Sequence, residues 1–185
     1  MNADYTVPVL PFLNVTCYLT GLFWADRGDH HHRGIDLATS GSRPLYSILS
    51  GTVLQNAYNP SLGNYITVKD YNTGVAYRYC HMRNRSPKAV GSSVALFEYV
   101  GDEGMTGSAT GIHVHLEMKD MSNTDTWVQS NNRNDYINPC DYLGFPNVHN
   151  ISIYCDGTPP PPPPTTKKSK FPWVLYANKF RAGIR

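Results

Sequence analysis

The chain has 185 residues, of which 41% are hydrophobic and only 16% charged, so it can bury a core and is not a disordered chain. Its 13 Tyr, 15 Gly and 14 Pro favour short strands and frequent turns over long helices. No apolar run approaches the roughly 20 residues that cross a bilayer, so we expect no transmembrane segment.

The net charge of +2 conceals an uneven distribution along the chain. Residues 1–157 hold all 14 acidic residues but only ten of the 16 basic ones, which gives this part a charge of −4. The last six basic residues give the remainder +6. A mildly acidic body is not suited to nucleic acid, whereas the basic end could contact an anionic partner.

Short strands are predicted from the N-terminal third of the chain to about residue 118. Residues 5–23 are apolar and β-rich, and a polar loop follows at 26–32. Further strands are expected between glycine turns. The expected segments are 45–49 with 51–55 as one hairpin, 65–68 with 75–79 around a turn at 72–74, then 92–99 and 112–118.

The rest of the chain predicts little regular structure. Residues 121–135 are polar and Asn-rich, which is typical of a surface loop, and Pro139 is placed to open a short helix. We therefore expect a mainly β, antiparallel domain over residues 1–157 with long loops and little helix. A proline-rich, basic linker over 158–170 should include a polyproline II run at 159–164, and a short basic aromatic tail over 171–185 follows.

The four cysteines, Cys17, Cys80, Cys140 and Cys155, include no C-x-x-C pair, so a zinc ribbon is not expected. They could be buried thiols or form bridges. Cys140–Cys155 is then the favoured pair because its loop is short.

The first residues lack the basic and apolar regions of a Sec signal peptide. This predicts another export route or a piece of a longer chain.

Six of the seven histidines lie at three places in the chain, 30–32, 81, and 113 with 115, and the seventh is His149. If 112–118 is a strand, His113, His115 and Glu117 share one of its faces. Two imidazoles and one carboxylate are a common ligand set of catalytic zinc. A lone His-x-His on a strand can equally be two polar residues on a solvated face, so this pattern alone does not establish a metal site.

The same alternation predicts that Tyr77, Tyr79 and His81 share a face, opposite Cys80. A Cys–His hydrolase is a weaker alternative, because this arrangement turns Cys80 away from His81. If the strands at 75–81 and 112–118 are neighbours, several imidazoles should meet in one cleft.

Short motifs along the chain resemble, in order and in spacing, those of the lysostaphin-like zinc endopeptidases, which cut peptidoglycan peptides. Residues 32–36 fit H-x-G-x-D, 79–82 fit Y-x-H-L, 90–94 fit V-G-x-x-V, and 104–117 fit G-x-T-G-x-S-T-G-x-H-L-H-F-E. The similarity covers about residues 8–146. Departures from the pattern occur at Arg43, Phe97, Ala109, Val114 and Leu116, none of which is a chemical position.

The resemblance implies a role for eight residues and one zinc ion per chain. His32, Asp36 and His115 correspond to the zinc ligands, and His81 and His113 to catalytic residues beside the open coordination position. The residues expected to line the substrate cleft are Asn64, Tyr79 and Thr110.

The implied reaction is hydrolysis of a peptide bond in the stem peptide or cross-bridge of bacterial peptidoglycan. The enzyme would act at the cell wall, as a phage lysis or tail-associated enzyme or as part of a larger secreted protein. Its tail would contact wall polymer, a membrane surface or another virion subunit. The alternative is a weak or inactive binding or structural module. Such modules typically lack one of the five chemical positions, and all five are present here, which favours the enzyme.

Overall fold

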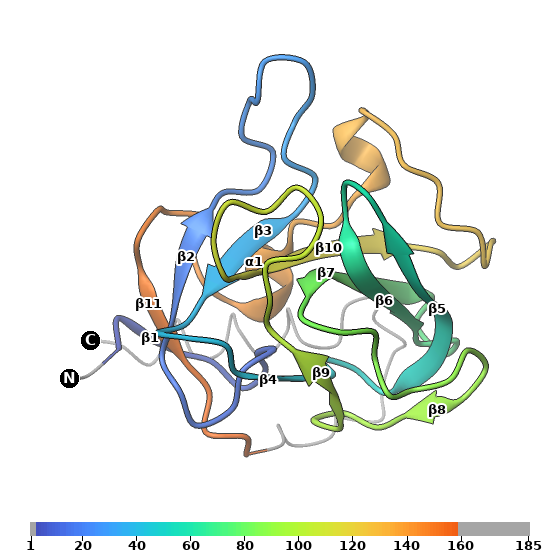
Figure 1. Ribbon diagram of the computed structural model, residues 1–185, viewed down its shortest axis with the longest axis horizontal. Helices are drawn as coiled ribbons and strands as arrows, with labels where there is room; N and C mark the ends of the chain where they lie inside the picture. The colour runs from blue at the N-terminus through green and yellow to red at the C-terminus, as the bar shows by residue number, and fades with distance from the viewer. Residues whose placement is uncertain (1–2, 159–185) are drawn as a thin grey trace, which may run out of the picture.

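Short strands between tight turns build almost all of the regular structure in the computed structural model, which describes residues 3–158 (Figure 1). In this part of the chain one sheet has nine strands. Their order across the sheet is β1 (Tyr5–Thr6), β11 (Ser152–Tyr154), β2 (Cys17–Gly21), β3 (Ile35–Ala38), β10 (Val114–Asp120), β7 (Val75–Met82), β6 (Gly63–Lys69), β5 (Gly51–Asn59) and β8 (Ser93–Val94).

The remaining elements are few. β4 (Pro44–Tyr46) and β9 (Tyr99–Asp102) form a separate two-stranded sheet, and the helices within residues 3–158 are a 3-10 turn, η1 (Arg133–Asp135), and α1 (Pro139–Leu143). In the part of the chain that the structure describes, all strand pairs are antiparallel except β1 with β11. The predicted mainly β, antiparallel fold is confirmed. Across residues 3–158, no helix combines the length and apolar character needed to cross a membrane.

One face of the large sheet packs on the core. In the central strands, Leu116 on β10 lies opposite Tyr79 on β7, and Tyr79 lies opposite Ile66 on β6; all three are fully buried. The Tyr79 hydroxyl donates to the Tyr46 carbonyl at 2.8 Å, and the hydroxyl of the neighbouring Tyr77 donates to Ser47 Oγ at 2.8 Å. The buried phenols therefore keep hydrogen-bond partners, as burial requires.

The opposite face of the same strands is polar, yet it is also buried. Arg78 on β7 faces Glu117 on β10, and both are almost fully covered. The segment 121–137 covers this face: its Trp127 ring lies 4.3 Å from the Arg78 guanidinium, and its Val128 carbonyl accepts a hydrogen bond from Lys119 at 2.5 Å. The predicted surface loop is thus a cover for the sheet, anchored by a buried tryptophan.

One predicted hairpin is wrong. The segments 45–49 and 51–55 do not pair, because β4 pairs with β9 whereas β5 pairs with β6 and β8. The predicted hairpin around residues 72–74 is confirmed as β6–β7. The predicted helix is confirmed as α1, where Asn138 caps the N-terminus by accepting from Cys140 N, and Gly144, with φ 92°, ends the helix.

The four cysteines are buried and free, so the favoured Cys140–Cys155 bridge is not formed. Burial raises the pKa of the Cys17 thiol to about 12. The alternative prediction, that the four cysteines are buried thiols, is confirmed. The polyproline run, most of the linker and the tail fall on residues 159–185, which lie outside the described residues, and the expectations for them stay predictions.

Candidate metal centre and active site

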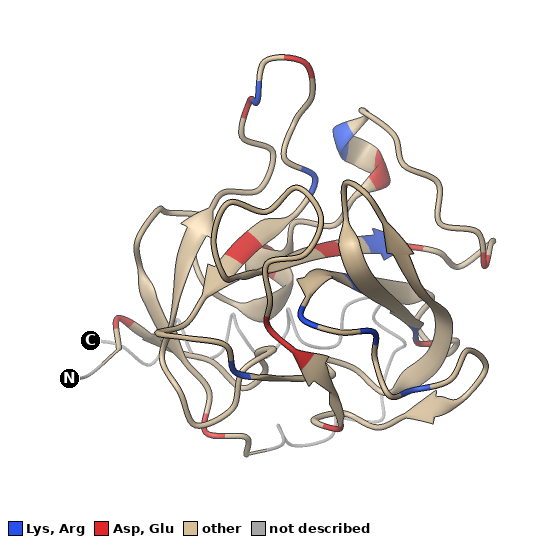
Figure 2. Ribbon diagram, in the orientation of Figure 1, with Lys and Arg blue, Asp and Glu red and all other residues tan. Residues whose placement is uncertain are grey.

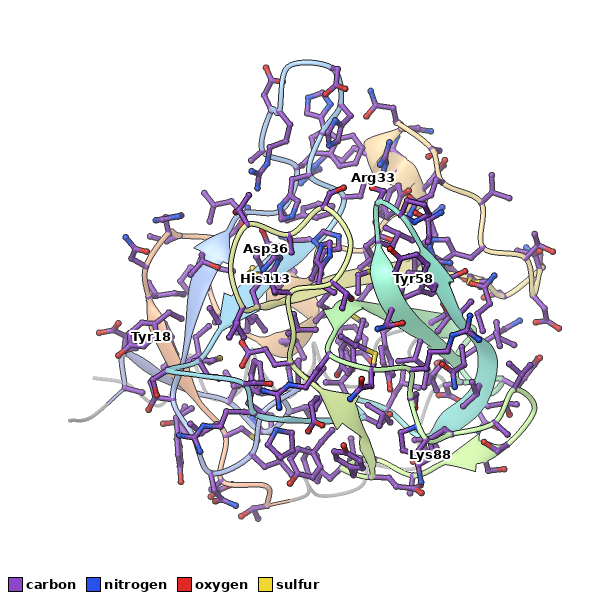
Figure 3. The ribbon with its side chains drawn as sticks, in the orientation of Figure 1. Tyr18, Arg33, Asp36, Tyr58, Lys88 and His113 are labelled. Carbon is purple, nitrogen blue, oxygen red and sulfur yellow. The ribbon has the colours of Figure 1, made fainter. Side chains whose placement is uncertain are left out.

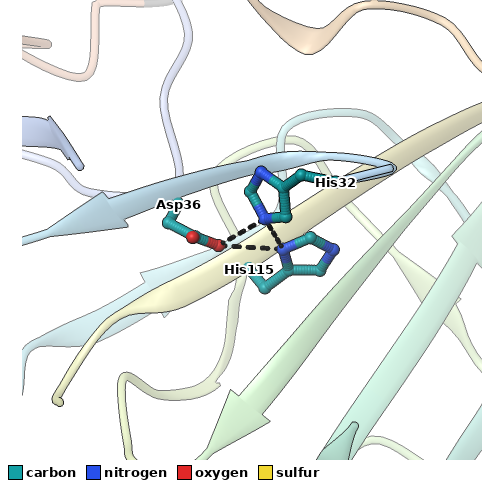
Figure 4. Close-up of side chains that lie close together, drawn as sticks. All are labelled: His32, Asp36 and His115. Carbon is teal, nitrogen blue, oxygen red and sulfur yellow. Dashed lines mark hydrogen bonds and ion pairs between the residues drawn. The ribbon is translucent and has the colours of Figure 1, made fainter. Parts of the chain in front are cut away.

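Three potential metal ligands converge where β3 and β10 meet. Asp36 on β3 lies directly opposite His115 on β10, so both side chains project from the same face. His32 comes from the end of the loop before β3. His32 Nε2 lies 3.1 Å from Asp36 Oδ1 and 2.9 Å from His115 Nδ1, and His115 Nδ1 lies 2.9 Å from Asp36 Oδ1 (Figure 4).

The partners of the two rings show which nitrogens face the cluster. His32 Nδ1 lies 2.7 Å from the Leu22 carbonyl, which can only accept, so Nδ1 carries the hydrogen and Nε2 offers a lone pair. His115 directs Nε2 toward Glu117 Oε1 at 3.5 Å, which leaves Nδ1 toward the cluster. Three electron-pair donors within 4.8 Å of one another therefore point to one place. A cation between them would relieve their repulsion, and nitrogen and carboxylate oxygen are donors that zinc favours.

Neighbouring groups shift the pKa values of the cluster strongly. Burial disfavours the Asp36 carboxylate, but its close polar contacts with the His115 and His32 rings outweigh burial and hold the Asp36 pKa well below its ordinary range. Burial likewise disfavours a charged His115, yet its hydrogen bonds with Asp36 and Glu117 raise the His115 pKa to about 9. Asp36 and Glu117 thus stabilise a positive charge on the His115 ring that lies between them.

His81 reaches this site through an irregularity in β7. Its φ of 60° is left-handed, and the register between β6 and β7 shifts between Asn64 and Ile66. The His81 ring lies 4.8 Å from the His113 ring and 6.0 Å from the His115 ring, measured between centroids. Burial lowers the His81 pKa to about 4, so its imidazole is neutral at physiological pH.

The expectation that Tyr77, Tyr79 and His81 share one face is therefore wrong. Tyr77 and Tyr79 point into the core, whereas the backbone turn at His81 directs this side chain to the cleft. Cys80 lies opposite His115 and so faces the site side of the sheet, which also differs from the prediction. Burial raises the Cys80 pKa well above its ordinary value, so the thiol is not an activated nucleophile.

His113 lies just before β10, bridged to Gly104, and its ring stands beside the cluster. Its Nε2 lies 3.6 Å from Asp36 Oδ1, and its Nδ1 donates to the Gly111 carbonyl at 2.9 Å. His81 Nδ1 donates in the same way to the Thr106 carbonyl at 2.9 Å. In both rings the proton is thus on Nδ1, and Nε2 is left as an acceptor.

An open cleft of about 480 Å³ contains all five residues. Its walls are the loop before β3, the β5–β6 turn with Ser61 and Leu62, and the loop before β10 with Thr110. Figure 3 shows Asp36 and His113 close together between these loops, and Figure 2 marks acidic residues on β3 and β10.

Of the three expected cleft residues, only Thr110 lines the cleft. Tyr79 is fully buried in the core, so its predicted place in the cleft is wrong. Asn64 does not line the cleft either, because its amide donates to the carbonyls of Met82 and Arg83 at 3.3 and 3.2 Å.

Two residues that support the ligands had no assigned role in the sequence analysis. Glu117 was predicted to share a face with His115, and this spacing could have identified it as the partner of Nε2. Gly21 on β2 gave no signal in the sequence. It lies opposite Asp36, and a Cβ on Gly21 would lie 2.1 Å from Asp36 Oδ2.

Substitution of Gly21 by alanine should displace the Asp36 carboxylate. We expect Gly21→Ala to weaken zinc binding by about 10-fold or more, the range found for residues that orient metal ligands. Zinc affinity can be measured by competition with a chelator. Tyr18→Ala changes an exposed residue of the same strand and is the matched control. Equal affinities of the two variants and the unmodified protein would refute this role of Gly21.

Two imidazoles and a carboxylate beside two further histidines in an open cleft are an arrangement typical of metal-dependent hydrolases. The chain belongs to peptidase family M23, whose sequence model matches residues 30–134. It is 34% identical over 86 residues to the peptidoglycan DD-endopeptidase ShyC of Vibrio cholerae, a match covering 46% of this chain and 19% of that protein. The chain spans between 19% and 23% of the length of the curated relatives that it matches.

Solved structures show the same fold. The chain resembles a mutant catalytic domain of the prophage-encoded M23 protein EnpA from Enterococcus faecalis, with a TM-score of 0.53 and 26% identity over 72% of this chain and 94% of that one. It also resembles the catalytic domain of the antimicrobial peptidase lysostaphin from Staphylococcus simulans, with a TM-score of 0.55 and 21% identity over 69% of this chain and 90% of that one.

Proposed function

We propose that this protein is a zinc-dependent endopeptidase that hydrolyses peptide bonds of bacterial peptidoglycan, in the stem peptide or the cross-bridge. The observation that supports this most is the convergence of His32 Nε2, Asp36 Oδ1 and His115 Nδ1 beside two acceptor imidazoles in an open cleft. These three residues would hold one zinc ion per chain.

Bound at this cluster, zinc would lower the pKa of a coordinated water to about 7 and polarise the scissile carbonyl. The chain's own residues supply the proton transfers. His81 and His113 each keep the proton on Nδ1 through a backbone carbonyl, so each presents a neutral Nε2 to the cleft. One Nε2 can accept the proton of the attacking water, and the resulting imidazolium can donate it to the leaving amine or stabilise the oxyanion.

Peptidoglycan is proposed as the substrate because ShyC and the other Vibrio cholerae relatives are named peptidoglycan DD-endopeptidases. The cleft is open and is lined by small or polar residues such as Ser61, Ser108, Ala109 and Thr110, which suits an extended peptide of small residues. The site of action would be the bacterial cell wall. A phage-borne wall hydrolase and a domain of a secreted protein would both bring the cleft there, with the tail on wall polymer, a membrane surface or a virion subunit.

The alternative, an inactive binding or structural module, is not favoured. All five chemical positions are present, and the described structure brings them into one cleft with their acceptor atoms directed inward.

Digestion of purified cell walls tests the proposal. Zinc-loaded protein is incubated with sacculi of several cross-link types, and the released muropeptides are identified by mass spectrometry. We expect new peptide termini in at least one wall type, and none with Asp36→Ala or after chelation. Release of reducing sugars without new peptide termini, or no release from any wall, would contradict the proposed reaction.

A further inference from the structure

The short segment 129–131 contacts residues that flank or hold both histidine ligands, although it contributes no atom to the cluster. It belongs to the cover formed by residues 121–137. Each of its three residues makes a hydrogen bond to a residue next to a proposed ligand or to a ligand's partner.

The first contact reaches His115 through Glu117. Gln129 Nε2 donates to both oxygens of Glu117, at 3.1 and 3.3 Å, and Glu117 Oε1 lies 3.5 Å from His115 Nε2. The orientation of the Gln129 amide is fixed, because its Oε1 accepts from the Tyr136 hydroxyl at 2.7 Å. Gln129 itself is exposed, but the carboxylate that it holds is 2% exposed.

Glu117 has a second partner that offsets its charge. Arg78 Nη1 lies 3.8 Å from Glu117 Oε2, and the Arg78 side chain is 4% exposed. The other guanidinium nitrogens of Arg78 donate to Thr67 Oγ1 at 3.1 Å and to Gln55 Oε1 at 2.6 Å. The carboxylate is therefore held from two sides, and its remaining direction is toward His115.

The other two contacts hold the chain on either side of His32. Asn131 Oδ1 accepts from His31 N at 3.2 Å, and the Ser130 carbonyl accepts from Arg33 Nε at 2.7 Å. His32 lies between these two anchored residues, and its own ring is fixed by the Leu22 carbonyl. Three consecutive residues thus restrain ligands that come from two distant segments.

We propose that residues 129–131 are positioning residues of the metal centre, which set the directions of His115 Nδ1 and His32 Nε2 through Glu117 and through His31 and Arg33. This inference depends on the proposed zinc site. A carboxylate on the far nitrogen of a ligating histidine fixes its orientation and typically contributes 10–100-fold to metal affinity. The 129–131 segment is separate from the ligand-bearing segments, and it aligns both the Glu117 carboxylate and His32.

The test measures zinc affinity by chelator competition, and the thermal stability of the zinc-free protein, in three variants. Glu117→Gln removes the charge beside His115, and the double substitution Gln129→Ala with Asn131→Ala removes the two side-chain contacts of the loop while leaving the Ser130 carbonyl and the buried carboxylate in place. Asn134→Ala, an exposed residue of the same cover, is the matched control. We expect zinc affinity about 10-fold or more weaker in the first two variants, and unchanged in the control.

The double variant keeps the test decisive if Glu117→Gln is unstable, since it leaves the Glu117–Arg78 pair in place. Zinc affinity within about twofold of the unmodified protein in the double variant would overturn the role of the loop, whatever happens to stability. If the unmodified protein binds no zinc, the proposed function fails instead, so the two failures are distinguishable.

Discussion

Substitution of His32 by alanine should remove bound zinc and hydrolysis together. His32 supplies one of the three protein donors in the cluster, and its Nε2 lies 2.9 Å from His115 Nδ1. With two donors left, the site loses the three-ligand set of a catalytic zinc. Zinc content by mass spectrometry and muropeptide release from a susceptible wall should both fall to background.

His149→Ala is the matched control for this loss. His149 is an exposed histidine whose ring bonds the Thr20 carbonyl at 2.8 Å, and it does not line the cleft. We expect this variant to retain one zinc and full activity. Stoichiometric zinc in purified His32→Ala would show that the ligand assignment is wrong.

Substitution of His81 or His113 should separate catalysis from metal binding. Each ring presents Nε2 beside the cluster but is not among the three converging donors. Loss of a general acid or base typically costs 10²–10⁴-fold in rate, so we expect activity at least about a hundredfold lower in His81→Ala and in His113→Ala. Zinc content and melting temperature should stay near those of the unmodified protein.

A purely structural role predicts the opposite pattern. If the two rings only packed the cleft wall, their removal would lower the melting temperature and change the rate modestly. A variant that keeps more than about a tenth of the original activity has not lost a general acid or base, given the size of that effect. In that case the assignment of that histidine as the general base is refuted.

Sequence patterns identified the main residues of the site, but they did not predict how all of these residues are arranged. The resemblance of the motifs predicted the cluster of His32, Asp36 and His115, and strand alternation placed Glu117 on the same face as His115. Strand alternation gave the wrong face in β7, because His81 adopts a left-handed φ of 60°. Glycine usually signals such a conformation in a sequence, and there is none at this position. The predicted place of Tyr79 in the cleft is wrong for this reason, because Tyr79 points into the core while His81 turns toward the cleft.

Local sequence patterns also could not predict which strands pair or how the 121–137 segment is held on the sheet. The segments 45–49 and 51–55 are adjacent and apolar, but β4 finds its partner in β9, about fifty residues along the chain. The polar composition of 121–135 predicted a surface loop, and most of its residues are exposed. That Lys69 and Lys119 bind its backbone carbonyls could not be predicted, because composition says nothing about backbone acceptors.

The most direct test of this account is a crystal structure of the zinc-loaded protein with anomalous data at the zinc edge. We predict one zinc per chain, bound by His32 Nε2, Asp36 and His115 Nδ1 with Zn–N distances of about 2.0–2.1 Å, and with His81 and His113 beyond coordination distance. Zinc bound by any other set of side chains, or no anomalous peak at this cluster, would contradict the account.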